Sequence, residues 1–190
     1  MISKREVLLS LYGAWRLLLR DAKGIEWLDD SHEGFWKSFF CAVLVLPGYV
    51  LLLAFSPTPY YEDAGIMRIF MVEGSAYVIG WAAWPLLVSY AAPVIDREDN
   101  FIRYIVAYNW SAAIQIGIYV AILLLRFSGV VPEGMLGLMS FASLIILLWY
   151  QWFIAKVGLD IAGTLPIAFV GAEFLLGQII RAVSFNLMHV

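Results

Sequence analysis

The sequence is poor in charged residues and has a single cysteine. Only 14% of its 190 residues are charged, whereas 63% are hydrophobic, and the mean hydropathy is +0.84. Soluble domains average about 25% charged and about 45–50% apolar residues, so this balance indicates a membrane protein. The one cysteine, Cys41, lies in an apolar run and excludes a framework of disulfides.

Signatures of enzymes and of cofactor sites are missing as well. The sequence contains no HExxH or GxSxG motif, no glycine-rich phosphate loop and no cysteine pair. Its two histidines, His32 and His189, stand far apart in the chain. We therefore expect a protein without catalytic residues, resident metal, cofactor or nucleic-acid partner.

Long apolar runs predict five membrane-spanning helices. Crossing a hydrocarbon core of about 30 Å takes about 20 helical residues, and apolar runs cover residues 35–55, 67–94, 101–125, 135–154 and 159–187. Pro47 and Pro85 lie inside the first two runs and are expected to bend them. The expected fold is an all-α integral membrane bundle, with residues 34–190 as the five-span domain.

Residues 1–33 predict a separate segment, an amphipathic surface helix followed by an acidic linker. Ser3 and Glu6 have the spacing of a capping box at the start of a helix over residues 3–23, and Gly24 is its expected end. Its apolar face comprises Val7, Leu8, Leu11, Trp15, Leu18, Leu19 and Ala22. Its basic residues are Lys4, Arg5, Arg16, Arg20 and Lys23.

This composition favours a helix that lies on the membrane and binds anionic lipid headgroups through the five basic residues. Packing of the helix against the spans, or on a partner protein, is the alternative. In the linker, Asp29, Asp30 and His32 suggest a metal site. The simpler interpretation makes Asp30 and Glu33 a capping pair for the next helix.

The basic residues also predict an orientation. With the N-terminus in the cytoplasm and the C-terminus outside, nine of the twelve lysines and arginines fall on the cytoplasmic side. The absence of a long lumenal domain favours a bacterial inner membrane.

The last span carries charge, which is costly in a hydrocarbon core and needs partners. From a rise of 1.5 Å per residue we expect Glu73 and Glu173 at similar depth, with Arg181 able to reach them. Gln115 and Gln178 complete an expected polar cluster. One hypothesis is a relay for protons or ions, or an anchor for a polar substrate. The other is a charge network that only fixes helix packing.

Two further features concern helix packing. Asn109 and Gln151 have comparable depth on the third and fourth spans and predict a hydrogen bond between helices. Small residues at four-residue spacing favour close helix contacts, within one chain or in a homo-oligomer. These residues are Ala76 with Gly80, Ala168 with Ala172, and Ala113 with Gly117 and Ala121.

Residues 34–39, GFWKSF, lead into a first span that contains a proline. With the cytoplasmic N-terminal segment and five closely spaced spans, the chain resembles the Yip-type membrane proteins over residues 30–187. The Asp-Leu-Tyr-Gly-Pro signature of eukaryotic members is absent. The resemblance implies a non-enzymatic protein that shapes or organises membranes, or assists other membrane proteins.

The sequence thus predicts a non-enzymatic interaction or membrane-organising module. Its expected partners are membrane lipids, and other membrane proteins or further copies of the same chain. The alternative is a small oligomeric transporter or channel that uses the Glu73, Glu173 and Arg181 cluster.

Overall fold

The computed structural model describes residues 2–55 and 65–189, and every regular element in these two ranges is helical. The N-terminal elements are α1 (Lys4–Leu18), the 3-10 helix η1 (Ala22–Trp27) and α2 (His32–Ser38). The others are α3 (Phe40–Ala54), α4 (Ile66–Val94), the 3-10 helix η3 (Glu98–Asn100), α5 (Phe101–Ser128), α6 (Glu133–Gly158) and α7 (Leu165–His189). The all-α class is therefore confirmed.

Five helical stretches are long and apolar enough to cross a membrane, as the sequence predicts. They are His32–Ala54, Ile66–Val94, Glu98–Ser128, Glu133–Gly158 and Leu165–Met188. The first stretch combines α2 and α3, which are separated at Phe39. The Ser38 hydroxyl donates to the Phe35 carbonyl at 2.6 Å, the group that the Phe39 amide would use in a regular helix.

The predicted start of the last span, at residue 159, is wrong. The chain turns at Asp160, where φ is 53°, and α7 begins only at Leu165. A residue from another part of the chain stabilises this turn: the Arg97 side chain, between α4 and η3, donates to the Asp160 carbonyl at 3.0 Å.

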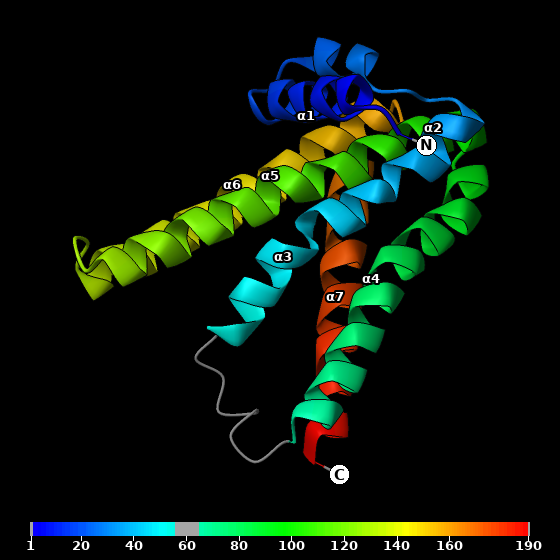
Figure 1. The fold of residues 1–190 in the computed structure, drawn as a ribbon. Coiled ribbons are helices and arrows are strands. Elements are labelled where there is room, and N and C mark those ends of the chain that lie inside the picture. The colour runs from blue at the N-terminus through cyan, green and yellow to red at the C-terminus, as the bar shows by residue number, and fades with distance from the viewer. Residues whose placement is uncertain (1, 56–64, 190) are drawn as a thin grey trace.

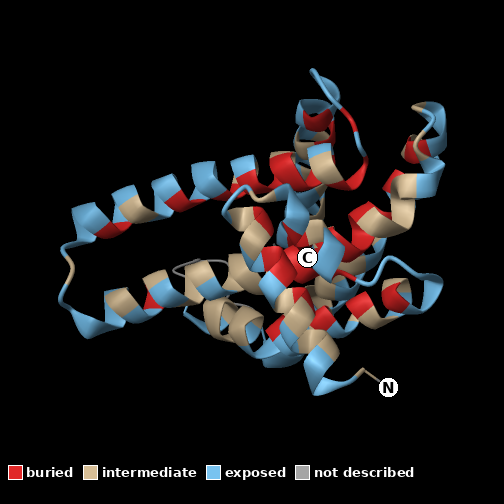
Figure 2. Cartoon of the chain, turned by 90° about the horizontal axis from the view of Figure 1, so that it is seen from above, coloured by how far each residue is buried: buried red, intermediate tan, exposed pale blue. Residues whose placement is uncertain are grey.

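The long helices form two diverging pairs (Figure 1). α5 and α6 run as a hairpin, whose turn begins at Gly129 with a positive φ of 66°. α4 and α7 form the second pair, and α3 lies against α5. The pairs meet at one end of the molecule, in a core that includes Trp84, Val88, Tyr104 and Ile154. Figure 2 shows buried residues gathered at this end, whereas the extended hairpin is mostly exposed or intermediate.

Helix α1 packs on α5 and α6, through the buried residues Ser10, Gly13, Ala14 and Leu17. The predicted capping box is confirmed, since the Glu6 amide donates to the Ser3 hydroxyl and the Ser3 amide to the Glu6 carboxylate. The predicted end of this helix at Gly24 is wrong.

Helix α1 stops at Leu18, and the backbone reverses at Arg20, where φ is 64°. The chain then returns along the helix as η1. Gly24 is buried in η1, where a Cβ on Gly13 would lie 2.7 Å from the Gly24 carbonyl oxygen. Two glycines are therefore needed for the backbones of α1 and η1 to approach this closely.

The predicted capping pair of Asp30 with Glu33 is also corrected. Ser31 is the N-cap of α2, and its hydroxyl accepts from the Gly34 amide at 3.0 Å. Glu33 instead forms an ion pair with Lys37 one turn later, at 2.8 Å. Serine has the extended backbone and the short hydroxyl that an N-cap requires.

Lys37 also contacts Glu6, at 2.5 Å, and so joins α2 to α1. The hydrogen bond from Lys37, followed by those from Ser3, lowers the pKa of the Glu6 carboxyl from 4.5 to about 2. A group with a lowered pKa stabilises the folded state fully above its ordinary pKa. That contribution is lost as the pH falls from 4.5 towards 2.

We therefore expect Glu6→Gln to loosen α1 at pH 6, seen as faster hydrogen–deuterium exchange of α1 amides than in the wild type at the same pH. The difference should shrink between pH 4.5 and 2.5, because the wild-type carboxyl is then also becoming protonated. Glu26→Gln, an exposed substitution in η1, serves as the control. A difference between wild type and Glu6→Gln that is constant with pH would contradict this role of Glu6.

Candidate functional site

A cleft of about 1000 Å³ opens between the two diverging helix pairs. α3 and α5 supply one wall, and α4 and α7 supply the other. All five residues of the predicted polar cluster line this cleft: Glu73, Gln115, Glu173, Gln178 and Arg181. They come from three helices, and the rest of the wall is mainly aliphatic and aromatic.

Small residues keep the cleft wide. A Cβ added to Gly80 on α4, or to Gly177 on α7, would meet no atom within 4 Å, and both glycines line the cleft. The small-residue ridge of Ala76 and Gly80 therefore faces open space, and the same is true of Gly117 on α5. The predicted helix contacts at these positions do not form within the described chain, because the helix pairs diverge.

The antiparallel pairing of α4 and α7 fixes the depth of each polar group. Near the open end, the Arg68 side chain donates to the Met188 carbonyl at 3.3 Å. At the closed end, the rings of Trp84 and Phe169 lie 6.2 Å apart. This register places Glu73 near the level of Arg181. Glu173, eight residues before Arg181, lies about 12 Å nearer the closed end at 1.5 Å per residue. The predicted similar depth of Glu73 and Glu173 is therefore wrong, because the register of α4 and α7 puts Glu73 level with Arg181.

Glu173 lies among aromatic rings at the closed end. Tyr108 on α5 interacts with its carboxyl group, and Trp81 and Trp84 also line the cleft. The Trp84 indole N–H donates to the Tyr104 hydroxyl at 3.0 Å. Within the described residues no lysine, arginine or histidine forms an ion pair with Glu173.

The remaining polar groups lie further towards the open end or along the α5 wall. The Tyr49 hydroxyl donates to Glu73 at 3.1 Å. Gln115 donates to the Ser111 hydroxyl at 3.1 Å, one turn earlier on α5. Arg181 and Gln178 are exposed on α7. Arg181 shares the cleft with both carboxylates but forms no ion pair with either in the part of the chain that is described.

Asn109 and Gln151 are buried outside this cleft and do not bond to each other. The Asn109 amide donates to Ser38 on α2 at 2.8 Å, and the Gln151 amide to Ser111 at 3.4 Å. Each side-chain carbonyl oxygen is left without a bond among the described residues. Each side chain therefore joins its helix to a neighbouring helix through a serine hydroxyl, and the predicted hydrogen bond between Asn109 and Gln151 is wrong.

The surface of α1 differs from the single apolar face that the sequence predicts. Val7, Leu11 and Leu18 pack against the core, but four large apolar side chains form an exposed stripe. These are Leu8 (67% exposed), Tyr12 (47%), Trp15 (48%) and Leu19 (61%). Helix α1 thus presents one face to the spans and a second apolar face outward.

The five predicted lipid-binding cations fall into two groups, one exposed and one in contact with other side chains of the protein. Lys4, Arg5 and Lys23 are exposed. Arg16 forms an ion pair with Asp21, which lowers the pKa of that carboxyl through the hydrogen bond from Arg16. The Arg20 guanidinium lies over the Trp149 ring, 4.3 Å from its centroid, so two of the five cations make contacts within the chain.

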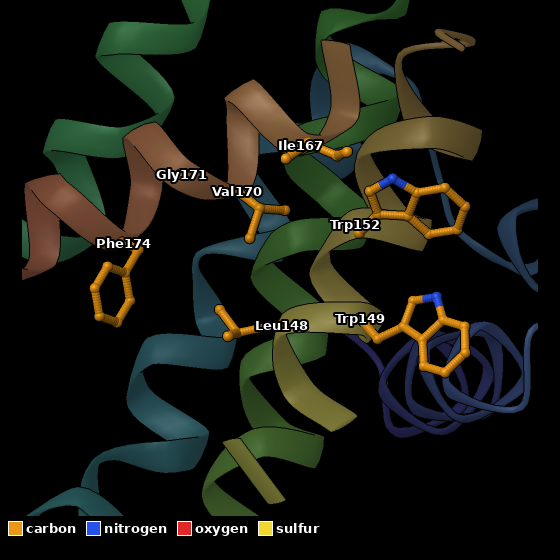
Figure 3. A pocket seen from close by; sticks show the side chains of 7 residues that line it. All are labelled: Leu148, Trp149, Trp152, Ile167, Val170, Gly171 and Phe174. Atoms are coloured by element: carbon orange, nitrogen blue, oxygen red, sulfur yellow. The ribbon is translucent and has the colours of Figure 1, made fainter. Parts of the chain in front are cut away.

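A second, smaller pocket of about 410 Å³ lies between α6 and α7. Figure 3 shows its apolar walls, to which Leu148, Trp149, Trp152 and Phe174 contribute. It contains no titratable side chain and offers only dispersion and hydrophobic contacts. A metal centre is not formed in residues 2–55 and 65–189, where no three His, Cys, Asp or Glu side chains converge.

Comparison with models of known protein families, with curated proteins and with solved structures found no match. The resemblance to Yip-type proteins therefore stays a prediction. The site must be interpreted from its own chemistry.

The aromatic part of the cleft was not predicted from the sequence. Tyr77, Trp81 and Trp84 follow Glu73 at intervals of four, four and three residues, and all four line the cleft. This helical spacing puts them on one face of α4. It was the available signal that a charged residue and three aromatic rings share one surface.

A charged cleft of this width should contain water, because charged side chains at membrane depth face aqueous cavities or partners. We predict that Gly177→Cys reacts with a polar maleimide and that Gly137→Cys, exposed on α6 outside the cleft, reacts much more slowly. Cys41 is fully buried and should contribute no background. Equal labelling of the two engineered thiols would contradict a hydrated cleft.

Proposed function

We propose that the protein is a non-enzymatic binding module of the membrane whose cleft holds an amphipathic molecule taken from the bilayer. One observation carries this proposal: a wide cleft combines apolar walls with a few charged groups at defined depths. Small-molecule sites are typically about 300–1000 Å³, mainly apolar, with few polar groups. The volume and lining of the cleft fit that description.

The proposal includes insertion of the five apolar helices in a bacterial inner membrane, with the N-terminus in the cytoplasm. Helix α1 would then lie at the cytoplasmic surface. Its exposed stripe would contact lipid, while Lys4, Arg5 and Lys23 would bind anionic headgroups. A Yip-like role in organising membranes is compatible with a lipid ligand and a surface helix.

A small transporter that uses Glu73, Glu173 and Arg181 is the alternative. Transport requires access to the site from both sides of the membrane. In this conformation the cleft is closed at the end where Trp84, Val88 and Tyr104 are buried. The geometry therefore favours binding.

The test fills the cleft without disturbing the protein. Gly80→Leu adds a side chain where a Cβ meets no atom, and Gly137→Leu adds the same side chain at an equally open position outside the cleft. By native mass spectrometry after detergent exchange, we expect wild type and Gly137→Leu to retain a bound amphiphile. Gly80→Leu should lose it, whereas equal retention in all three proteins would refute binding in the cleft.

A further inference from the structure

Resting on the proposed function, we propose that the closed end of the cleft selects an amphiphile with a positively charged ammonium headgroup. The headgroup would lie against the Glu173 carboxylate and the rings of Trp81 and Tyr108. Its alkyl chain would extend along the aliphatic wall of α3 and α5.

Glu173 has a carboxyl group with few polar neighbours. A carboxylate offers about four acceptor positions, and Tyr108 is the polar neighbour on α5 that interacts with Glu173. None of the described cationic side chains forms an ion pair with it, and Arg181 lies about 12 Å further along α7 by helical rise. A cationic ligand would supply the missing counter-charge.

The surroundings of Glu173 are aromatic. Trp84 and Tyr108 have ring centroids 6.2 Å apart with an interplanar angle of 44°, and Tyr77 and Trp81 have centroids 6.2 Å apart. Trp84 is fully buried and bonded through its N–H to Tyr104, so the partly exposed rings of Trp81 and Tyr108 are the ones that a ligand can contact. Aromatic faces attract ammonium groups, and quaternary ammonium ligands are recognised in this way.

The position of the cation in the cleft matters as well. Among the described lining residues Arg181 is the guanidinium, and Glu173 lies about 12 Å from it along α7. The carboxylate at the closed end has the aromatic neighbours, whereas the guanidinium lies towards the open end. An anionic headgroup at the closed end would meet the Glu173 charge at short range, which low-dielectric surroundings make costly.

The chain of the amphiphile would meet an aliphatic wall. Val45 and Leu52 on α3, with Ile116 on α5, line the wall opposite α4 and α7. An alkyl chain buried there gains about 0.8 kcal/mol per methylene group. The cleft therefore suits a single long chain joined to a compact cationic head.

The experiment compares three probes with the same twelve-carbon chain: dodecyltrimethylammonium, dodecanol and dodecanoate. Binding to the full chain in dodecyl maltoside micelles is followed through tryptophan emission. We expect the ammonium probe, whose charge is independent of pH, to bind at least about tenfold more tightly than dodecanol, a difference of about 1.4 kcal/mol. Dodecanoate should bind most weakly.

Glu173→Gln should reduce this preference at least about fivefold while dodecanol binding is retained, because only the charge is removed. Glu133→Gln, an exposed change of the same charge at the start of α6, should leave it unaltered. The comparison of the three probes on the wild type needs no variant, so it tests the ammonium preference even if Glu173→Gln does not fold.

The outcomes separate the two proposals. Equal binding of the three probes, all blocked by Gly80→Leu, would overturn the ammonium preference and leave the binding cleft standing. Binding that Gly80→Leu does not alter for any probe would overturn the proposed function itself. Tighter binding of dodecanoate would overturn the assignment of Glu173 as the headgroup partner.

Discussion

The whole arrangement depends on the aromatic contact that ties the two helix pairs together at one end. Trp84 on α4 donates to Tyr104 on α5 and packs edge-on against Phe169 on α7, and Trp84 and Tyr104 are fully buried. A buried indole needs a partner for its N–H, which Tyr104 supplies. Because the pairs are joined here and diverge beyond it, the cleft has a closed end and an open end.

The polar groups of the cleft follow from the same geometry. Charge is tolerated at membrane depth only where partners or water reach it, and the divergence of the helices gives Glu73, Glu173 and Arg181 a common open space. Among the described residues, Arg181 forms no ion pair with Glu73 or with Glu173. This arrangement favours the proposed ligand site over a packing network, because a packing network would use direct ion pairs between these groups.

Hydropathy was sufficient to predict the five long helices, because the length and apolarity of a span are local properties of the sequence. The ends of the helices were harder to predict. The Ser38 hydroxyl, the left-handed turn at Asp160 and the reversal at Arg20 depend on single side-chain or backbone bonds. Counting depth along the helices predicted a common site for five polar residues, which do line one cleft, but it wrongly put Glu73 and Glu173 at similar depth. The return of η1 along α1 could not be predicted, because it relies on the fit of Gly13 to Gly24, which is a tertiary contact.

The divergence of the helix pairs is tested most directly by distances between spin labels in the membrane-reconstituted protein, with Cys41 replaced by serine. Labels at Ile66 and Leu187 report on the packed α4–α7 pair, and labels at Ile66 and Ser128 span the two pairs. The account predicts that the second distance exceeds about 20 Å, about twice the 8–10 Å separation of packed helices. Two similar, short distances would mean a closed bundle without a cleft and would contradict it.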